Sequence, residues 1–211
     1  MGLQVLVVAA SAGELEGLGD AKPSGPWEAS VVGIGLVAAT VGTLWGLRER
    51  EPRAVVLVGT CGAYAGSGLG IGDVVTARAV RLVEPAAVRA QAQFPPALST
   101  ASAADARLAS ELARAGTLPA DVATTLAITV DDALAGEIAR ETGCGVEHLE
   151  AYGVAAACAS AGVPFAAVLA VANVVGSRAR SEWQANHAAA DAKAARVVRR
   201  WLANRLANYP G

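Results

Sequence analysis

The stretch that decides the fold class reads AVVLVG at residues 54–59. Apolar residues follow one another there without the alternation of a half-exposed strand, which is typical of a strand buried on both faces. Comparable apolar runs occupy residues 3–10 and 164–171. Strands of this type occur in mainly parallel sheets with helices on both faces, so the sequence predicts an α/β fold.

The rest of the chain alternates such strands with segments of helical periodicity. Strands are expected at residues 3–10, 28–32, 54–59, 74–83, 123–130 and 164–171, and helices at 37–50, 101–115, 132–141, 149–160 and 181–208. Residues 84–100 carry three prolines and little periodicity, so a loop or flap is expected there. No linker or repeat interrupts the pattern. It indicates a single domain over residues 1–211, a three-layer sandwich with a central mixed, mainly parallel sheet flanked by helices.

The composition excludes several classes of protein. Hydrophobic residues make up 54% of the 211 residues and charged residues 17%, with a formal net charge of −2. This balance argues against a nucleic-acid partner, because nucleic-acid-binding surfaces normally show a basic excess. No uninterrupted apolar run reaches the ~20 residues that span a bilayer, so no membrane association is expected.

Few residues are available for metal or disulfide chemistry. The three cysteines are odd in number and lack metal-ligand spacing, so neither a metal site nor a cofactor is expected. The two histidines, His148 and His187, are expected to be satisfied core or surface residues. Buried, reduced thiols indicate a cytoplasmic protein, and no basic residue precedes the first apolar run as a signal peptide requires.

Ligands of such sheets bind at the carboxyl ends of the strands, so residues that follow strands carry most weight. Glu14 follows the first strand, where a carboxylate is able to orient and deprotonate a water molecule. The alternative is an acid that stabilises a helix N-terminus. Cys61 and Gly62 follow the third strand in a glycine-rich stretch, which lets a ligand approach the backbone closely. This stretch matches no dinucleotide fingerprint or Walker loop, and a structural turn is the alternative.

Three further polar residues point to one pocket. Glu147 and Glu150 are three residues apart and would share one face of a helix. A carboxylate accepts two hydrogen bonds and so chelates adjacent ribose hydroxyls, while a solvated helix start is the alternative, chiefly for Glu147. Asn173 follows an apolar strand, where ligand or protein must satisfy its amide. We therefore expect a carboxylate and an amide at the mouth of the same pocket.

Taken together, these segments resemble the purine nucleoside phosphorylase and nucleosidase superfamily over nearly the whole chain. The motifs that carry the resemblance lie at residues 6–14, 33–39, 58–63, 71–75, 146–151 and 172–176. Within the superfamily the chain is most similar to the futalosine hydrolases of menaquinone biosynthesis. Its ribose motif, VEHLEA, has one residue more than that of the methylthioadenosine nucleosidases. Relatives are usually dimers or larger assemblies, so the resemblance implies a homo-oligomer.

The resemblance also implies a role for each matching residue. Glu14 would orient the hydrolytic water, Glu150 would hold the ribose hydroxyls, and Asn173 would read the purine. Leu149 stands where the family usually has Met beneath the ribose. Arg178, like Arg180 beside it, would pair with the carboxylate on the aryl tail of futalosine, a surface ion pair being the alternative.

Two other positions depart from the family pattern. Leu169 stands where relatives often carry Arg, and Ala172 replaces a common Ser. Both changes remove a polar side chain from the network that would hold Asn173 and Glu150 in place.

The implied reaction is hydrolysis of the N-glycosidic bond of a purine nucleoside, for futalosine giving hypoxanthine and dehypoxanthine futalosine. An amide donates to O6 or N7 of a 6-oxopurine without first needing a proton, so Asn173 favours hypoxanthine nucleosides. The loop after the first strand has no Arg or Lys before Lys22, which favours water over phosphate as nucleophile. Three alternatives stay open: a non-catalytic purine- or nucleoside-binding protein, a methylthioadenosine-type nucleosidase, and a phosphorylase.

Overall fold

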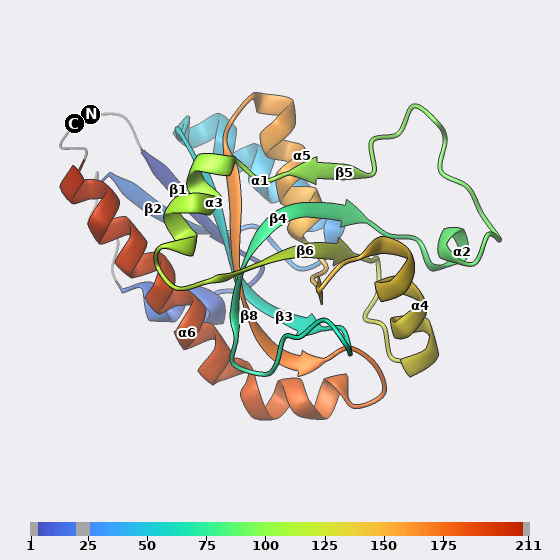
Figure 1. Cartoon of the computed structure of the whole chain (residues 1–211). Helices are drawn as coiled ribbons and strands as arrows, with labels where there is room; N and C mark the ends of the chain where they lie inside the picture. Colours follow the sequence, from blue (N-terminus) through green and yellow to red (C-terminus); the bar gives the residue numbers. More distant parts are fainter. Residues whose placement is uncertain (1–3, 20–25, 209–211) are drawn as a thin grey trace.

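The computed structural model describes residues 4–19 and 26–208. Its strands are β1 (Val5–Ala9), β2 (Trp27–Val31), β3 (Val55–Ala63), β4 (Val74–Leu82), β5 (Ala101–Ala103), β6 (Leu118–Thr124), β7 (Val146–Glu147) and β8 (Phe165–Val174). Its helices are the 3-10 helix η1 (Gly13–Leu18), α1 (Leu36–Arg50), α2 (Pro85–Val88), α3 (Ala106–Ala113), α4 (Asp132–Thr142), α5 (Ala151–Ala161) and α6 (Ala179–Asn208) (Figure 1). Leu3 and Lys22, which entered the sequence expectations, lie outside the described residues. Within the described ranges, no helix is long and apolar enough to cross a membrane.

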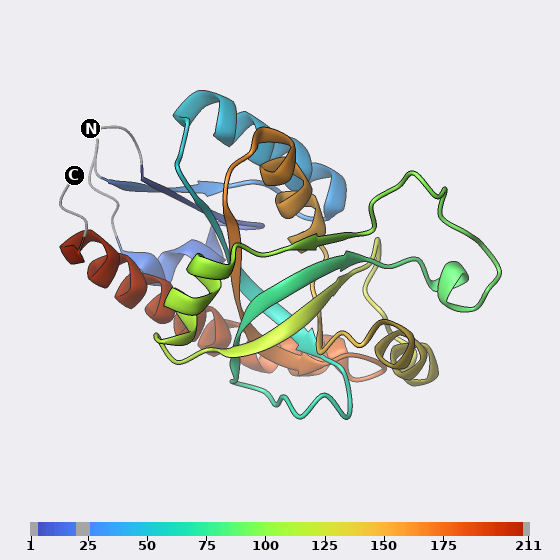
Figure 2. The same ribbon diagram turned by 45° about the horizontal axis from the view of Figure 1, so that its top comes forward.

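The eight strands form one mixed sheet that closes on itself. β3 pairs with β7, β7 with β6, β6 with β4, β4 with β8, and β8 again with β3, which makes a five-stranded barrel. β1 and β2 extend the sheet from β3, and β5 extends it from β4 (Figure 2). The mixed sheet and the flanking helices of the expectation are present, but the sheet is not the middle layer of a simple sandwich. Strand twist and the irregularities in the β3–β8 and β4–β6 pairings favour such curling and closure.

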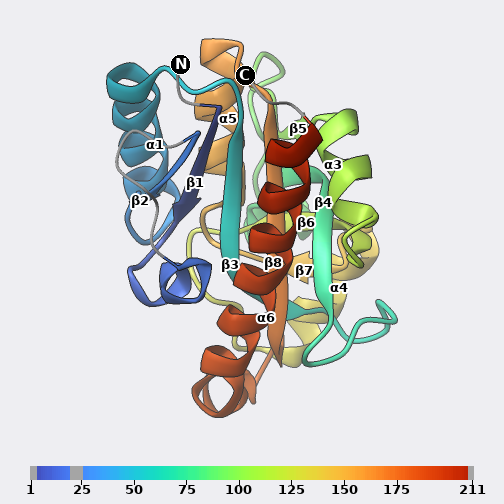
Figure 3. The same ribbon diagram turned by 90° about the vertical axis from the view of Figure 1, so that its left-hand side faces the viewer.

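Both faces of the central strands are buried, which explains the unbroken apolar run at residues 54–59. Val55 and Leu57 of β3 belong to one apolar cluster, which α1 and α5 cover. Val56 and Val58 belong to a second, which α3 and α6 cover. Figure 3 shows α6 running along β3 and β8 on this second face. The expectation that β3 is buried on both faces is therefore confirmed, although the sheet is curled into a barrel.

Two segments differ from the sequence expectations. The helix expected over residues 101–115 is divided into β5 and α3, and α3 begins after Asp105, whose carboxylate accepts the Leu108 N–H at 2.9 Å. The strand expected over residues 123–130 is wrong for most of its length, because β6 ends at Thr124. The apolar residues that suggested a strand lie in the loop that follows.

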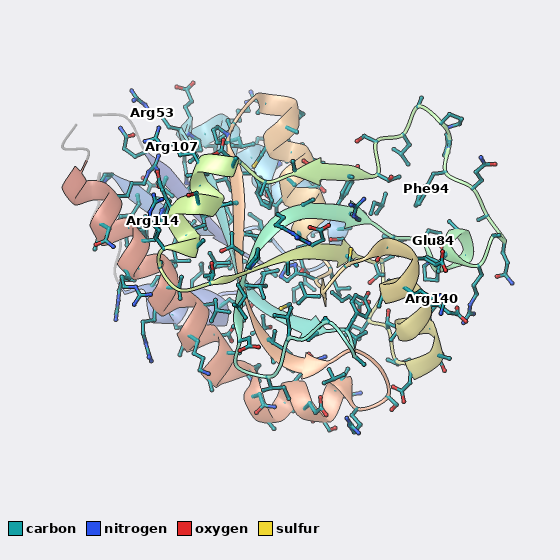
Figure 4. The ribbon with its side chains drawn as sticks, viewed as in Figure 1. Arg53, Glu84, Phe94, Arg107, Arg114 and Arg140 are labelled. Carbon is teal, nitrogen blue, oxygen red and sulfur yellow. The ribbon has the colours of Figure 1, made fainter. Side chains whose placement is uncertain are left out.

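Residues 84–100 form α2 and a long loop that extends away from the barrel in both Figures 1 and 2. Glu84 caps α2 by accepting the Ala86 N–H at 3.1 Å, and the Tyr152 hydroxyl donates to the Ser99 carbonyl. Figure 4 labels Glu84 at the base of the segment and Phe94 along the loop. Four of the labelled side chains in that view are the exposed arginines Arg53, Arg107, Arg114 and Arg140.

Candidate functional site

A cavity of about 730 Å³ lies where the carboxyl ends of β1, β3, β7 and β8 meet the start of α6. The residues that line it are Ala10, Ser11, Glu14, Ile34, Thr60, Cys61, Gly62, Ile128, Thr129, Val130, Glu147, His148, Leu149, Glu150, Asn173, Val175, Ala179, Arg180, Trp183 and Gln184. The structure thus brings together every site residue expected from the sequence except Arg178. No residue of 84–100 lines the cavity.

Glu14 stands at one side of the cavity on η1, directly after β1. Its Oε2 accepts the Ser11 N–H at 3.0 Å, and its Oε1 accepts the Thr60 N–H at 3.4 Å. These two backbone donors tie the carboxylate to the ends of β1 and β3. The carboxylate is therefore held at the cavity wall instead of extending into solvent from a helix N-terminus.

Glycine at position 59 makes room for this arrangement. A Cβ on Gly59 would come within 2.6 Å of Glu14 Oε1 and 3.4 Å of His148 Nε2. Contacts below 3.0 Å do not occur for real Cβ atoms, so any larger residue would displace the carboxylate. Glu14 Oε1 and His148 Nε2 thus both lie on the side of β3 that a side chain at position 59 would occupy.

Glu150 lies 5% exposed at the N-cap position of α5. Its Oε1 accepts the Gly35 N–H at 2.7 Å, and its Oε2 lies 3.2 Å from His148 Nδ1. The N-terminal end of α5 adds a favourable positive potential for the carboxylate. The backbone N–H before α1 thus holds Oε1 of Glu150, and Oε2 lies next to the His148 ring.

Glu147 and Glu150 do not share a helix face as expected, because Glu147 belongs to β7 and α5 begins only at Ala151. Glu147 is 7% exposed and fully engaged by protein donors. It accepts the Tyr64 hydroxyl at 2.9 Å and the Thr129 N–H and hydroxyl at 3.0 and 2.6 Å. Burial, with the Glu147 charge next, raises the pKa of Tyr64 well above its ordinary value, so the phenol stays a donor. Glu147 therefore fastens the loop after β6 to the barrel.

Asn173 is placed by an irregularity between β3 and β8. The pairing register shifts between Cys61 and Gly62, so Gly62 lies opposite Asn173 on β8 and opposite Glu147 on β7. A Cβ on Gly62 would come within 2.8 Å of Asn173 Nδ2. A residue larger than glycine at position 62 would therefore displace the Asn173 amide. The amide is 8% exposed, and its Nδ2 donates to the Val174 carbonyl at 3.0 Å.

Cys61 and Leu149 line the cavity as apolar groups. Burial raises the pKa of the Cys61 thiol far above its ordinary value, so the sulfur carries its proton and is no nucleophile. Leu149 is half-buried beside Glu150. Leu169 and Ala172, the two departures from the family pattern, are fully buried in the apolar clusters on opposite faces of β8.

Arg178 lies away from the cavity. Its side chain is 74% exposed, and its Nε donates to Glu182 Oε1 at 3.0 Å one turn further along α6. Arg180 lines the cavity in its place, together with Trp183, whose Nε1 donates to Thr60 Oγ1 at 3.2 Å.

His148 and Thr129 are two polar cavity residues that sequence reasoning did not assign to the site. His148 is one of two histidines and stands between the two acids of the ribose motif. That position was the available signal, since a buried imidazole next to a carboxylate seldom serves packing alone. Thr129 gave no such signal because its segment was expected to be a strand.

Comparison with known proteins identifies relatives of this chain. Residues 5–203 match the phosphorylase superfamily. The futalosine hydrolase of Acidothermus cellulolyticus is 32% identical over 209 residues, which cover 87% of this chain and 84% of that protein. The solved structure of the native futalosine hydrolase of Helicobacter pylori superposes with a TM-score of 0.85 at 15% identity, covering 96% of this chain and 98% of the other.

A 5′-methylthioadenosine/S-adenosylhomocysteine nucleosidase from Colwellia psychrerythraea, solved in complex with adenine, superposes with a TM-score of 0.83 at 18% identity and covers 96% of each chain. At these identities the solved structures establish the fold, while the superfamily match and the sequence relative extend over most of the chain. The protein therefore belongs to the phosphorylase superfamily.

Proposed function

We propose that the protein is a purine nucleosidase that hydrolyses the N-glycosidic bond of a 6-oxopurine nucleoside, with futalosine as the favoured substrate. The observation that carries the proposal is one cavity on which Glu14, Glu150 and Asn173 converge. The identity of 32% with a futalosine hydrolase over most of the chain supports the same substrate. In a bacterial cell that makes menaquinone through futalosine, this activity belongs in the cytoplasm.

Each of the three residues has a role that suits its surroundings. Glu150 accepts the ribose hydroxyls through Oε2, since the Gly35 N–H already occupies Oε1. Its negative charge stabilises the positive charge that develops on the sugar as the C1′–N9 bond lengthens. Asn173 uses one amide hydrogen for the Val174 carbonyl and retains the second for O6 or N7 of the base.

Water is the nucleophile in this mechanism. Glu14 Oε1 orients a water molecule toward C1′ and takes its proton as the C1′–O bond forms and the C1′–N9 bond breaks. The electron pair of the broken bond leaves on the purine, where the Asn173 amide stabilises it until the base takes a proton. Glu14 then returns its proton to solvent, and the enzyme is ready for another cycle.

Arg180 is proposed to meet the carboxylate on the aryl tail of futalosine. The sequence alone favoured Arg178, but that side chain pairs with Glu182 outside the cavity. Arg180 lines the cavity and is exposed, so its guanidinium is free to pair with a carboxylate at the mouth.

We also propose that the protein is a homo-oligomer. The outer side of α1 exposes Val37 (72%), Val41 (48%) and Trp45 (55%), and Ile34 just before it is 72% exposed and lines the cavity. An apolar surface that continues to a substrate cavity is typical of an interface. Light scattering should give a dimer or larger species for the wild type and a monomer for Val37→Asp. A monomeric wild type would contradict this part of the proposal.

The activity is tested by a release assay on futalosine, inosine and methylthioadenosine, each with and without phosphate. Hypoxanthine released from futalosine without phosphate is the expected result. Release that requires phosphate would identify a phosphorylase, and release of adenine alone would identify a methylthioadenosine-type nucleosidase. Tight binding of nucleoside without release would identify a non-catalytic binding protein.

Glu150→Gln provides the matched variant for this assay. It keeps the shape of the side chain but removes the charge that stabilises the sugar cation, so kcat should fall by about 100-fold or more. Glu141→Gln, at a carboxylate 52% exposed on α4, is the control and should leave kcat unchanged. Equal rates for Glu150→Gln and the wild type would remove Glu150 from the mechanism.

A further inference from the structure

Glu147 is the third carboxylate of the cavity, and the proposed mechanism does not use it. The residue is 7% exposed, and it forms no ion pair with any residue in the described ranges. Burying a carboxylate without a cation is costly, and an apolar side chain of similar size would fill the same space without that cost. An acid in this place therefore calls for a reason other than packing.

The hydrogen bonds of Glu147 lead to two separate segments. Its Oε2 accepts the hydroxyl of Tyr64, directly after β3, at 2.9 Å and the hydroxyl of Thr129 at 2.6 Å. Its Oε1 accepts the Thr129 N–H at 3.0 Å. Two of the three bonds thus end on one residue of the loop after β6. A carboxylate suits this arrangement, because both of its oxygens accept.

The loop after β6, residues 125–130, has little else to hold its middle. Leu126, Ile128 and Val130 are 66%, 62% and 67% exposed, so apolar packing does not fix their positions. Thr129, which stands between them, is 4% exposed. Among the described residues, no other hydrogen bond joins this loop to a different segment. The conformation of the loop therefore depends on Glu147.

The same loop forms one wall of the cavity, which Ile128 and Val130 line with aliphatic side chains. Glu147 on β7 and Asn173 on β8 pair from opposite sides with one residue of β3, Gly62. The point at which the loop is held is thus close to the amide that is proposed to bind the base.

We propose that Glu147 is a positioning residue that sets the purine-side wall of the cavity by holding the loop after β6 through Thr129. The ligand in this role comes from the proposed function, but the hydrogen bonds on which it depends do not. Glu147 takes no part in bond making and exchanges no proton with substrate. Its bonds give the loop, before binding, the order that a ligand would otherwise have to impose, and this raises the affinity for the base.

Two substitutions remove the same kind of donor from the same oxygen of Glu147. Thr129→Val removes a hydroxyl on the loop, and Tyr64→Phe removes one on the β3 side, outside the cavity. Each leaves the buried carboxylate with one donor fewer, so both should lower the melting temperature by similar amounts. Only Thr129→Val loosens the loop. Its dissociation constant for hypoxanthine, measured by calorimetry, should rise about fivefold to tenfold, against less than about twofold for Tyr64→Phe.

The kinetic parameters should follow the same contrast. KM for futalosine should rise in Thr129→Val but not in Tyr64→Phe, with kcat within about threefold of wild type in both, because Glu14 and Glu150 stay in place. A purely structural network would lower the melting temperature and affect base binding alike in the two variants. Equal dissociation constants for hypoxanthine in the two variants would therefore overturn the proposal.

Combination with Glu147→Leu shows whether Thr129 acts through Glu147. The double variant Glu147→Leu/Thr129→Val should bind hypoxanthine no more weakly than Glu147→Leu alone, because the hydroxyl has already lost its acceptor. Losses that multiply would mean that Thr129 contacts the base itself, and would overturn the proposal.

Amide exchange in the wild type gives a test that does not depend on whether a variant folds. The Thr129 N–H should exchange with solvent at least about tenfold more slowly than those of Ile128 and Val130. Equal exchange at the three positions would overturn the proposal even in an active enzyme. A wild type that binds hypoxanthine but releases no base from futalosine would refute the proposed hydrolysis alone, and the two hydroxyl variants would still decide the role of Glu147. A wild type that does not bind hypoxanthine would overturn both.

Discussion

At the scale of single residues, the site depends as much on missing side chains as on those present. Gly59 and Gly62 lie on β3 next to Glu14 and Asn173, and a Cβ at position 59 would collide with Glu14 and one at position 62 with Asn173. The geometry of the candidate site is therefore set in part by the backbone of β3. Substituting a glycine there changes the site without touching a functional side chain.

Gly59→Ala should lower kcat by about 100-fold, because a Cβ within 2.6 Å of Glu14 Oε1 forces the carboxylate out of place. Steady-state kinetics on futalosine provide the measurement. The control is Gly136→Ala on α4, where a Cβ meets no atom within 4 Å and kcat should not change. Wild-type activity of Gly59→Ala would show that Glu14 need not stay where the structure has it.

Asn173→Asp should change the preferred base. A carboxylate repels the O6 and N7 lone pairs of a 6-oxopurine at neutral pH, so futalosine hydrolysis should fall by about 100-fold. In acid the protonated group becomes a donor to N7, which should favour adenine nucleosides. The ratio of kcat/KM for futalosine to that for methylthioadenosine, measured from pH 5 to 8, is the test. A ratio that does not change would assign base selection to another residue.

At the scale of elements, helices α1 and α5 pack with their backbones close together. A Cβ on Gly153 of α5 would come within 2.6 Å of the Leu36 carbonyl and 2.5 Å of Thr40 Oγ1 on α1. Small residues at this contact explain the alanine- and glycine-rich sequence of α5. They also bring Gly35, at the start of α1, within reach of Glu150 at the start of α5.

Gly153→Ala and Gly136→Ala form a matched pair of helix substitutions. Alanine favours a helix over glycine by about 1 kcal/mol, so Gly136→Ala should raise the free energy of unfolding by roughly that amount. Gly153→Ala should lower it by about 1–3 kcal/mol, because the methyl group overpacks a backbone contact. Urea unfolding gives both values. Stabilisation by both substitutions would mean that α1 and α5 are further apart than described.

The sequence was sufficient for the elements whose neighbours are local and apolar. The buried strands β1, β3 and β8 and the long helix α6 were predictable, because apolar runs and helical stripes reflect burial directly. The barrel was not, since closure depends on the long-range β4–β8 pairing. The loop after β6 was mistaken for a strand because its residues are apolar. Its conformation depends instead on hydrogen bonds that Thr129 donates to Glu147, 18 residues later in the chain.

The candidate site was predictable to a similar extent. Glu14, Glu150 and Asn173 follow strands or begin a helix, so the rule that ligands bind at strand ends made them candidates, and the resemblance to the superfamily supplied the role expected of each. The choice between Arg178 and Arg180 depends on which way α6 faces, and that is set by its packing on the barrel. The position of His148 between Glu147 and Glu150 was visible in the sequence, but its burial beside the cavity follows from the closed barrel.

At the scale of the whole molecule, a carboxyl group on α6 makes the stability depend on pH. Asp191 has one oxygen, Oδ1, that is buried without a hydrogen-bond partner, and His187 Nδ1 lies 3.7 Å from the other. Burial, reinforced by the nearby charge of Glu14, raises the pKa of Asp191 to about 6. The unfolded chain has an ordinary aspartate pKa of about 4. The native state therefore binds this proton more tightly, and stability falls as the pH rises from about 4 to 6.

Asp191→Asn should remove that dependence. Well below pH 4 the variant and the wild type should be equally stable, since the wild-type carboxyl is then protonated in both states. Above pH 6 the variant should be more stable by about 1–2 kcal/mol, a value reduced for the partial exposure of the group. Urea unfolding across this range is the measurement, with Glu49→Gln as an exposed control that should track the wild type. A difference that stays constant from pH 4 to 7 would contradict the pKa of Asp191.

Closure of the barrel also protects the protein against aggregation. Exposed strand edges invite pairing with strands of other chains, and proteins avoid this by keeping edges short or covered. Within the described sheet, β3, β4, β6, β7 and β8 each have neighbours on both sides, which leaves β2 and the three-residue β5 as edges. The strands that carry the cavity are thus out of reach of a foreign strand. Intermolecular strand addition is confined to the edge strands β2 and β5, of which β5 has only three residues.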